Sequence, residues 1–155
     1  MIKLEKPIAL AADHGGFALK EAIKEHLQEL GLAYQDFGTV TGESCDYPQV
    51  AQPACEAVVK GDCGLALLFC GTGVGISMAA NKIRGIRACC CSDVFSAEFT
   101  RRHNNANALC MGGRVVGAGL ACSLVDAFLN AEFEGERHER RVNMLKEIED
   151  AQAAL

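Results

Sequence analysis

The sequence predicts one α/β domain over residues 1–155, a three-layer α/β/α sandwich around a five-stranded parallel sheet. Short apolar runs alternate five times with segments of helical periodicity, and one additional helix follows at the C-terminus. The chain has 155 residues with 50% hydrophobic content, which suits one sizeable core. No internal repeat, linker or low-complexity tract divides it. Such a sheet is Rossmann-like, and its ligands bind at the carboxyl ends of the strands.

The first half of the chain supplies three strands and two helices. Leu19, Ile23 and Leu27 recur at helical spacing, and Gly31 is the expected C-terminal cap of their helix. Pro53 is compatible with the following helix only in its first turn, where a missing N–H is tolerated. The expected elements are a strand over 8–12, a helix over 19–30, a strand over 33–37, a helix over 49–60 and a strand over 65–69.

The second half continues the alternation and then adds the last helix. Asp93 is placed to cap a helix that runs to about His103. A loop around Gly135 separates the two final helices. The expected elements are a helix over 76–83, a strand over 86–91, a helix over 93–103, a strand over 108–111, and helices over 119–129 and 139–153.

Charge and cysteine content exclude several classes of protein. A net charge of −5 and a pI near 5.4 argue against a general nucleic-acid binder. The nine cysteines are an odd number without C-x-x-C spacing, so neither a disulfide framework nor a metal site is expected. Buried reduced thiols, which we assume for Cys89, Cys90, Cys91 and Cys122, indicate a cytoplasmic protein.

The ends of the sequence give no targeting or membrane signal. Met1–Pro7 is too short and too charged for a signal peptide. No apolar run approaches the length that spans a bilayer, so no membrane partner is expected.

The stretch around Cys70 carries the strongest signal for a site. An apolar run over 65–69 ends in this thiol, and Gly71, Gly73 and Gly75 allow a sharp turn and close approach to a ligand. A helix beginning at Ile76 would direct unpaired N–H groups and its positive dipole end at the loop. That field attracts anions and would stabilise a Cys70 thiolate. The alternatives are one more buried cysteine and a simple tight turn.

Three known motifs fail at this loop. The chain has no G-x-x-x-x-G-K-[ST], which excludes a nucleoside-triphosphate P-loop. Gly71-x-Gly73 follows a strand as in a dinucleotide-binding fingerprint, but Ile76 stands where the third glycine belongs. Ile76 also stands where a cysteine phosphatase needs an arginine to hold the phosphoryl oxygens.

Segments spread along the chain match one known family in order, from about residue 8 to about residue 149. The sequence resembles ribose-5-phosphate isomerase type B, a sugar-phosphate isomerase family that also includes the galactose-6-phosphate isomerase subunits. The matching segments are Asp13-His14-Gly15-Gly16, Asp46-Tyr47-Pro48, Cys70-Gly-Thr-Gly-Val-Gly-Ile-Ser77, Ala80-Asn-Lys82, His103-Asn104, Gly113-Arg-Val-Val-Gly117 and Arg137-His-x-x-Arg141-Val.

The resemblance implies an aldose–ketose isomerase without a cofactor, interconverting ribose 5-phosphate and ribulose 5-phosphate in the non-oxidative pentose phosphate pathway. It also implies a homodimer or homotetramer with active sites between subunits. Some relatives replace the cysteine and carry a glutamate base in the glycine loop. Here Cys70 is present and apolar Ile76 occupies the other position, as in the cysteine-base branch. Allose 6-phosphate or galactose 6-phosphate remains an alternative substrate.

The chemistry of isomerisation gives these residue types their roles. A base must remove a proton from C2, and Cys70 is the candidate. Backbone N–H groups from Gly71 to Gly75, a stretch that includes Thr72, Gly73 and Val74, would hold the enediolate charge. Sugar phosphates are mostly cyclic, so ring oxygens also need acid–base help, a task suited to imidazole. The resemblance assigns this step to His103, whereas the sequence alone would allow a simply exposed histidine beside two arginines.

The remaining candidates bind substrate. Asp13 and His14 are expected to bind sugar hydroxyls, unless Asp13 merely caps the first helix. By resemblance, Tyr47 and Thr72 are candidates for lining the site, and Thr72 is also a catalytic candidate. By resemblance, Asn104 binds hydroxyls or the enediolate oxygen, and Arg114 belongs to the phosphate site.

Arg137 and Arg141 are four residues apart, so they share one face of the last helix if that helix begins before residue 139. That face continues into Leu145 and Ile148, so we expect an inward-pointing phosphate clamp at a subunit contact. The apolar stripe Val142, Leu145 and Ile148 is expected to pack on a second subunit.

Two other functional classes remain open from the sequence. One is a flavodoxin-like module that binds an anion without catalysis. The other is a thiol redox protein, against which the absence of a C-x-x-C pair argues.

Overall fold

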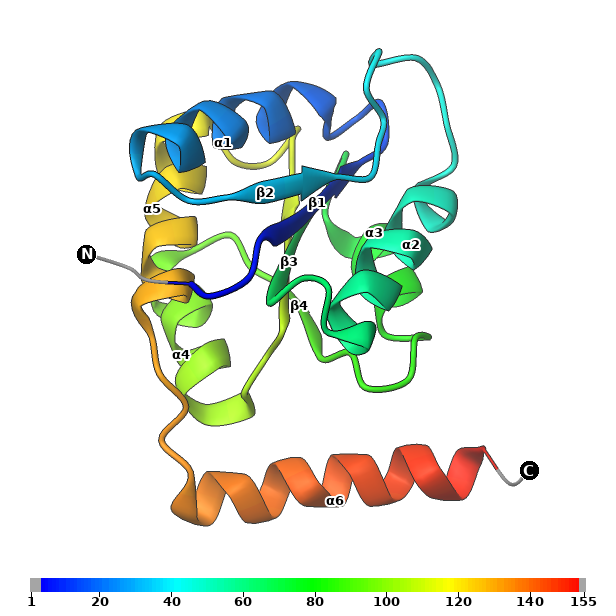
Figure 1. Ribbon diagram of the computed structural model, residues 1–155, viewed down its shortest axis with the longest axis vertical. Helices are drawn as coiled ribbons and strands as arrows, with labels where there is room; N and C mark the ends of the chain where they lie inside the picture. Colours follow the sequence, from blue (N-terminus) through cyan, green and yellow to red (C-terminus); the bar gives the residue numbers. More distant parts are fainter. Residues whose placement is uncertain (1–3, 154–155) are drawn as a thin grey trace.

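Five parallel strands form the central sheet, in the order β2-β1-β3-β5-β4 (Figure 1). The computed structural model describes residues 4–153, so the first three residues of the N-terminal segment considered above lie outside the described part. The predicted five-stranded parallel sheet is confirmed. The strands are β1 (Ile8–Ala12), β2 (Tyr34–Asp36), β3 (Leu65–Cys70), β4 (Ala88–Cys90) and β5 (Ala108–Gly112).

The three central strands differ from the two edge strands in burial. β1, β3 and β5 are buried at every position, as uninterrupted apolar runs predict for strands covered on both faces. β2 and β4 have only 3 residues each and are partly exposed. The sequence predicted both strands too long, as 33–37 and 86–91. Residue preferences do not reveal where an edge strand stops pairing with its neighbour.

Five of the six helices complete the three layers. α1, α4 and α5 cover one face of the sheet and α2 and α3 the other (Figure 1). Each face has its own apolar core, and the three-layer prediction is confirmed. The helices are α1 (Phe17–Glu29), α2 (Tyr47–Lys60), α3 (Val74–Ala80), α4 (Val94–Asn104), α5 (Ala118–Asn130) and α6 (Glu136–Gln152).

The signals for helix ends were mostly correct. The Asp93 carboxylate accepts a hydrogen bond from the Ser96 N–H at 2.7 Å and caps α4 as predicted. Gly31 follows α1 in the left-handed region, with φ 69°. The prediction for Pro53 was wrong, because α2 begins at Tyr47 and Pro53 therefore lies beyond its first turn. Its position is tolerated because Pro53 and Gln49 lie on the exposed face, where water can bond the carbonyl that the proline leaves unpaired.

Helix α6 lies apart from both layers and crosses the amino-terminal edge of the sheet (Figure 1). It contacts α4 near one end, and Glu149 near its other end accepts a hydrogen bond from the Gly85 N–H in the loop before β4. His138 is its only buried residue within the described part of the chain. None of the helices within residues 4–153 is long and apolar enough to cross a membrane.

Candidate active site

Three loops meet at the carboxyl edge of the sheet, after β1, β3 and β5. The Gly113 N–H donates to the Cys70 carbonyl at 2.8 Å, and the Arg114 N–H donates to the Gly71 carbonyl at 3.0 Å. A Cβ on Gly16 would overlap the backbone of Phe69, so only glycine lets the first loop lie against the third strand. Backbone hydrogen bonds and close packing therefore fix the three loops relative to one another.

Cys70 ends β3 and is 4% exposed. Its Sγ accepts a hydrogen bond from the Gly73 N–H at 3.1 Å. Gly73 adopts φ 79°, and a Cβ there would lie 2.8 Å from the carbonyl carbon of Met111. The sequence signal from the glycines thus corresponds to a turn that brings a backbone donor onto the thiol.

Tyr47, Thr72 and Arg114 surround the glycine loop. The Thr72 Oγ1 accepts a hydrogen bond from the Val74 N–H at 3.3 Å. A Cβ on Gly75 would lie 3.0 Å from the ring of Tyr47, and one on Gly71 would lie 3.1 Å from an Nη of Arg114. The structure therefore places a phenol and a guanidinium beside the loop, from elements far apart in the sequence.

Asp13 is buried and holds the first loop. Its Oδ1 accepts hydrogen bonds from the N–H groups of Gly15 at 2.8 Å and Gly16 at 3.1 Å. Gly16, with no side-chain cap, precedes α1, so the alternative that Asp13 caps this helix is wrong. His14 Nδ1 lies 3.4 Å from the Cys45 N–H, which donates to it. We call Asp13, His14, Tyr47, Cys70, Thr72 and Arg114, with the glycine loop 71–75, the carboxyl-edge group.

The other cysteines are free, as predicted, but not all are buried. Burial raises the pKa of Cys91, and that of Cys55, to about 12. The assumption of a buried thiol was wrong for Cys90, which is exposed because β4 is an edge strand, and Cys89 and Cys122 are half-buried. Cys90 Sγ lies 3.6 Å from the Thr72 carbonyl oxygen, to which it donates, and so adjoins the glycine loop.

His103 and Asn104 lie at the opposite edge of the sheet. They end α4, and residues 105–107 connect it to the amino-terminal end of β5. The rise from Ala66 to Cys70 along β3 is about 13 Å at roughly 3.3 Å per residue. Within one chain, His103 is therefore separated from Cys70 by at least the length of a strand.

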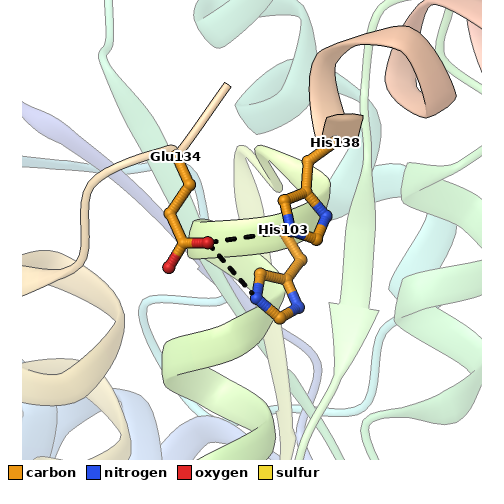
Figure 2. Close-up of side chains that lie close together, drawn as sticks. All are labelled: His103, Glu134 and His138. Carbon is orange, nitrogen blue, oxygen red and sulfur yellow. Dashed lines mark ion pairs between the residues drawn. The ribbon is translucent and has the colours of Figure 1, made fainter. Parts of the chain in front are cut away.

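His103 is held by contacts with two aromatic rings, of which His138 is drawn in Figure 2. Its ring stacks on His138 with centroids 4.0 Å apart and an interplanar angle of 8°. Phe99 meets it edge-on, with centroids 4.8 Å apart and an angle of 78°. Glu134 Oε2 lies 3.5 Å from His103 Nε2 and 3.7 Å from His138 Nε2.

Arg137 and Arg141 begin α6 beside these histidines, and both are exposed in the isolated chain. The expectation that they point inward was wrong for one chain, because α6 packs on the domain through little more than His138. A cavity of about 310 Å³ nevertheless opens between α4 and α6, lined by His103, Asn104, His138, Arg141, Val142 and Leu145. We call His103, Asn104, Glu134, Arg137, His138 and Arg141 the amino-edge group.

Glu134 and His138 were not singled out from the sequence, because Glu134 lies in the loop before α6, where a spacing of four residues does not indicate contact. With His103 they place three ligand-type atoms within 4.8 Å of one another. The nearly parallel imidazoles, however, direct their lone pairs side by side rather than at a common point. Glu134 is also ion-paired with Arg102, so the cluster suits protons and anions better than a metal ion.

Comparison with known proteins identifies the family to which this chain belongs. A model described as Ribose/Galactose Isomerase matches residues 8–145, nearly the whole chain. The chain belongs to the ribose/galactose isomerase family. The carboxyl-edge group and the first residues of α6, including Arg137 and Arg141, all lie within the matched span.

Relatives in the ribose/galactose isomerase family match in both sequence and structure. Ribose-5-phosphate isomerase B of Escherichia coli is 49% identical over 144 residues, which cover 93% of this chain and 97% of the relative. A ribose-5-phosphate isomerase B structure from Clostridium thermocellum is 46% identical, with a TM-score of 0.93, covering 94% of this chain and 99% of that one. A Mycoplasma genitalium ribose-5-phosphate isomerase B, solved with bound ribulose-5-phosphate, is 38% identical, with a TM-score of 0.90 and coverage of 96% and 99%.

Proposed function

We propose that this protein interconverts ribose 5-phosphate and ribulose 5-phosphate through an enediolate intermediate, with Cys70 as the base. Relatives with this activity in their names align over almost the whole chain. The observation that carries the mechanism is a nearly buried thiol at a strand end, with the Gly73 N–H directed at its sulfur. A base of this kind removes the C2 proton and returns it to C1.

The glycine loop supplies the charge stabilisation that the intermediate needs. Negative charge develops on the oxygens at C1 and C2 as the proton leaves, and the loop that follows Cys70 offers the backbone N–H groups of Gly71 to Gly75, of which that of Gly73 donates to the Cys70 sulfur. Thr72 and Tyr47 border the same loop, and Asp13 and His14 follow the neighbouring strand. These side chains would orient the sugar hydroxyls.

The amino-edge group supplies the other half of the reaction in this proposal. His103 opens the sugar ring, Asn104 binds a hydroxyl or enediolate oxygen, and Arg137 and Arg141 bind the phosphate together with Arg114. Because His103 and Cys70 lie at opposite edges of one sheet, one chain cannot bring both to one sugar. We therefore propose a homodimer, or a homotetramer of such dimers, in which each active site combines the two groups from different subunits.

The exposed face of α6 supports this arrangement. Leu145 is 50% exposed and Ile148 is 60% exposed in the single chain, beside the exposed Arg141. Val142, half-buried, continues the stripe. An apolar stripe that ends in arginines is what a helix would carry if it packed over a neighbour's anionic substrate.

A coupled assay for ribulose 5-phosphate formation tests the reaction itself, and a mixing experiment tests the composite site. Cys70→Ala and Arg141→Ala subunits, each inactive or weak alone, are expected to regain activity when mixed, because each heterodimer has one intact site. No recovery, with subunit exchange verified by mass spectrometry, would place the arginines in the same subunit's site as Cys70.

A six-carbon sugar phosphate is a second candidate substrate, because the matching family is described by both ribose and galactose. The length of the sugar depends on the distance between the phosphate clamp and the base across the subunit contact. Competing rates on ribose 5-phosphate and allose 6-phosphate decide the preference, and we expect the five-carbon sugar to react faster.

A further inference from the structure

Two contacts fix the plane of the His103 ring before any substrate binds. His138 covers one face at 4.0 Å, and the edge contact with Phe99 at 4.8 Å restricts rotation from another side. Phe95 stacks on Phe99 in turn, with centroids 4.2 Å apart, so the aromatic column continues along α4. An exposed histidine that needed only to titrate would not require this packing.

Glu134 is positioned as tightly as the ring that it faces. The Arg102 Nε donates to its Oε1 at 2.7 Å, and the Glu134 backbone N–H donates to the Arg102 carbonyl at 3.0 Å. Oε2 is left facing the Nε2 atoms of both histidines (Figure 2). Among residues 4–153, Glu134 is the one carboxylate recorded within 4 Å of either ring.

The two histidines are not equivalent, because their other partners differ. Arg137 Nε donates to His138 Nε2 at 3.4 Å, an arrangement that requires this nitrogen to carry no proton. Burial lowers the pKa of His138, and the charges of His103, Arg137 and Arg141 lower it further, while Glu134 acts in the opposite direction. These neighbours disfavour a proton on His138, whereas Glu134 Oε2 faces His103 Nε2 at 3.5 Å as a charged acceptor.

We propose that Glu134 and His138 are positioning residues for ring opening, Glu134 by sustaining the imidazolium of His103 and His138 by fixing its ring plane as a neutral stacking partner. This inference rests on the proposed function of His103. Nε2 of His103 faces Glu134 (Figure 2), which leaves Nδ1 to face the sugar. Nδ1 gives its proton to the ring oxygen as the C1–O bond breaks and then takes the proton of the C1 hydroxyl as the aldehyde forms.

The test compares Glu134→Gln with Glu134→Asp and with the control Glu132→Gln. Glu134→Gln keeps the shape and the contact with Arg102 but removes the negative charge. Glu132→Gln removes the same charge from an exposed position two residues earlier. The readouts are the pH profile of turnover on cyclic ribose 5-phosphate and the NMR titration of the two imidazoles in the resting enzyme.

We expect Glu134→Gln to lower turnover on the order of tenfold at neutral pH and to move its pH profile to lower pH, since a facing carboxylate favours the charged ring. His138 is expected to titrate at lower pH as well, because Glu134 raises its pKa. Glu134→Asp keeps the negative charge and should therefore retain most of the wild-type turnover, pH profile and His138 titration. Glu132→Gln should leave all three unchanged.

An unchanged pH profile and an unchanged His138 titration in Glu134→Gln would overturn the inference. So would equal effects in Glu132→Gln, because the response would then be to net charge. Failure of the wild-type protein to isomerise ribose 5-phosphate would instead reject the proposed function, and the NMR titration would still show whether Glu134 is coupled to the rings. Circular dichroism of each variant separates these outcomes from loss of folding.

Discussion

The two groups of site residues are held in place by different kinds of interaction. The carboxyl-edge group stands on loops fixed by backbone hydrogen bonds, between buried strands and with Cys70 nearly inaccessible. The amino-edge group is fixed by ring stacking and ion pairs, on the ends of α4 and α6, and its arginines are exposed. The first group is assembled within one chain, whereas the arginines of the second group point to the surface of the chain. This difference indicates which substitutions should affect the chemistry and which the binding of substrate.

The largest effect is expected at the base. Cys70→Ala should lower turnover by roughly 10³-fold or more, because a general base contributes on the order of 10²–10⁴-fold. Substrate binding, measured by calorimetry, should change little, since the base acts in the transition state.

Cys55→Ala is the matched control, because it removes a buried thiol whose pKa is raised to about 12. It should remain active. Near-normal turnover of Cys70→Ala would reject the assignment of the base.

The next effect concerns the stability of the carboxyl edge. Lys20 is fully buried, and its Nζ donates to both Asp36 oxygens at 2.7 Å and to the Thr39 carbonyl at 2.6 Å, beside the loop that carries Cys45. Lys20→Met should lower the free energy of unfolding by about 3 kcal/mol, because it leaves a partly buried carboxylate without its main partner. The exposed Lys60→Met, in an i,i+4 pair with Glu56, should shift the denaturation midpoint hardly at all.

The same ion pair predicts a dependence of stability on pH. Burial opposes the charge of Asp36, but hydrogen bonds from Lys20 and from the Gly38 N–H outweigh it, and the pKa of Asp36 lies below its ordinary value. The stabilisation is therefore present above about pH 3.9, the unfolded value, and is lost as the pH falls through the folded pKa. Thermal denaturation below pH 4 should show this loss in the wild type and much less of it in Lys20→Met.

The amino-edge group should respond in a different way. His103→Ala is expected to slow turnover of cyclic ribose 5-phosphate by about 10²-fold and to slow an open-chain substrate much less. Erythrose 4-phosphate is such a substrate, because the phosphate on O4 prevents closure of a five-membered ring. Equal losses on both sugars would mean that His103 acts at a step other than ring opening.

A smaller effect is expected from the exposed arginines. Arg137→Ala and Arg141→Ala should each raise KM by about tenfold or more with less change in kcat, because each removes a charge-assisted hydrogen bond to phosphate. Arg140→Ala, on another face of the same helix, serves as the control. If the wild type turned over unphosphorylated ribose equally well, the clamp would have no role.

The smallest effect is expected from metal removal. The His103, Glu134 and His138 cluster lies among cationic side chains, and its imidazoles are nearly parallel, so a chelator should leave activity unchanged. Loss of activity in chelator, restored by a divalent ion, would contradict this expectation.

The carboxyl-edge group was accessible to sequence reasoning because a general rule covers it. Cys70 and Asp13 follow apolar runs, and parallel strands bring their carboxyl ends to one edge. Tyr47 and Arg114 were assigned only by resemblance, since a residue at the start of a helix or in a later loop carries no periodic signal. The sequence pattern also failed for Cys90, because burial depends on which strand is at the edge of the sheet, and strand order is not encoded locally.

The arrangement of the amino-edge group could not be predicted from the sequence. His103 could be named from the family resemblance, but its distance from Cys70 follows only from α4 running back to the start of β5. Glu134 lies in a loop and joins the histidines through Arg102, thirty-two residues away in sequence. Stacking and ion pairs between distant segments leave no periodic pattern in the sequence. The contacts among these residues are therefore visible only in the three-dimensional structure.

The sparse packing of α6 has a consequence for amide hydrogen exchange. A helix with one buried residue has few tertiary contacts to lose when its backbone hydrogen bonds open, whereas the amides of β1, β3 and β5 open only when a core does. In a dilute, unassembled chain the amides of α6 should therefore exchange much faster than those of the central strands. The extent to which they slow as protein concentration rises would measure how much of the order of this helix is supplied by a neighbouring copy.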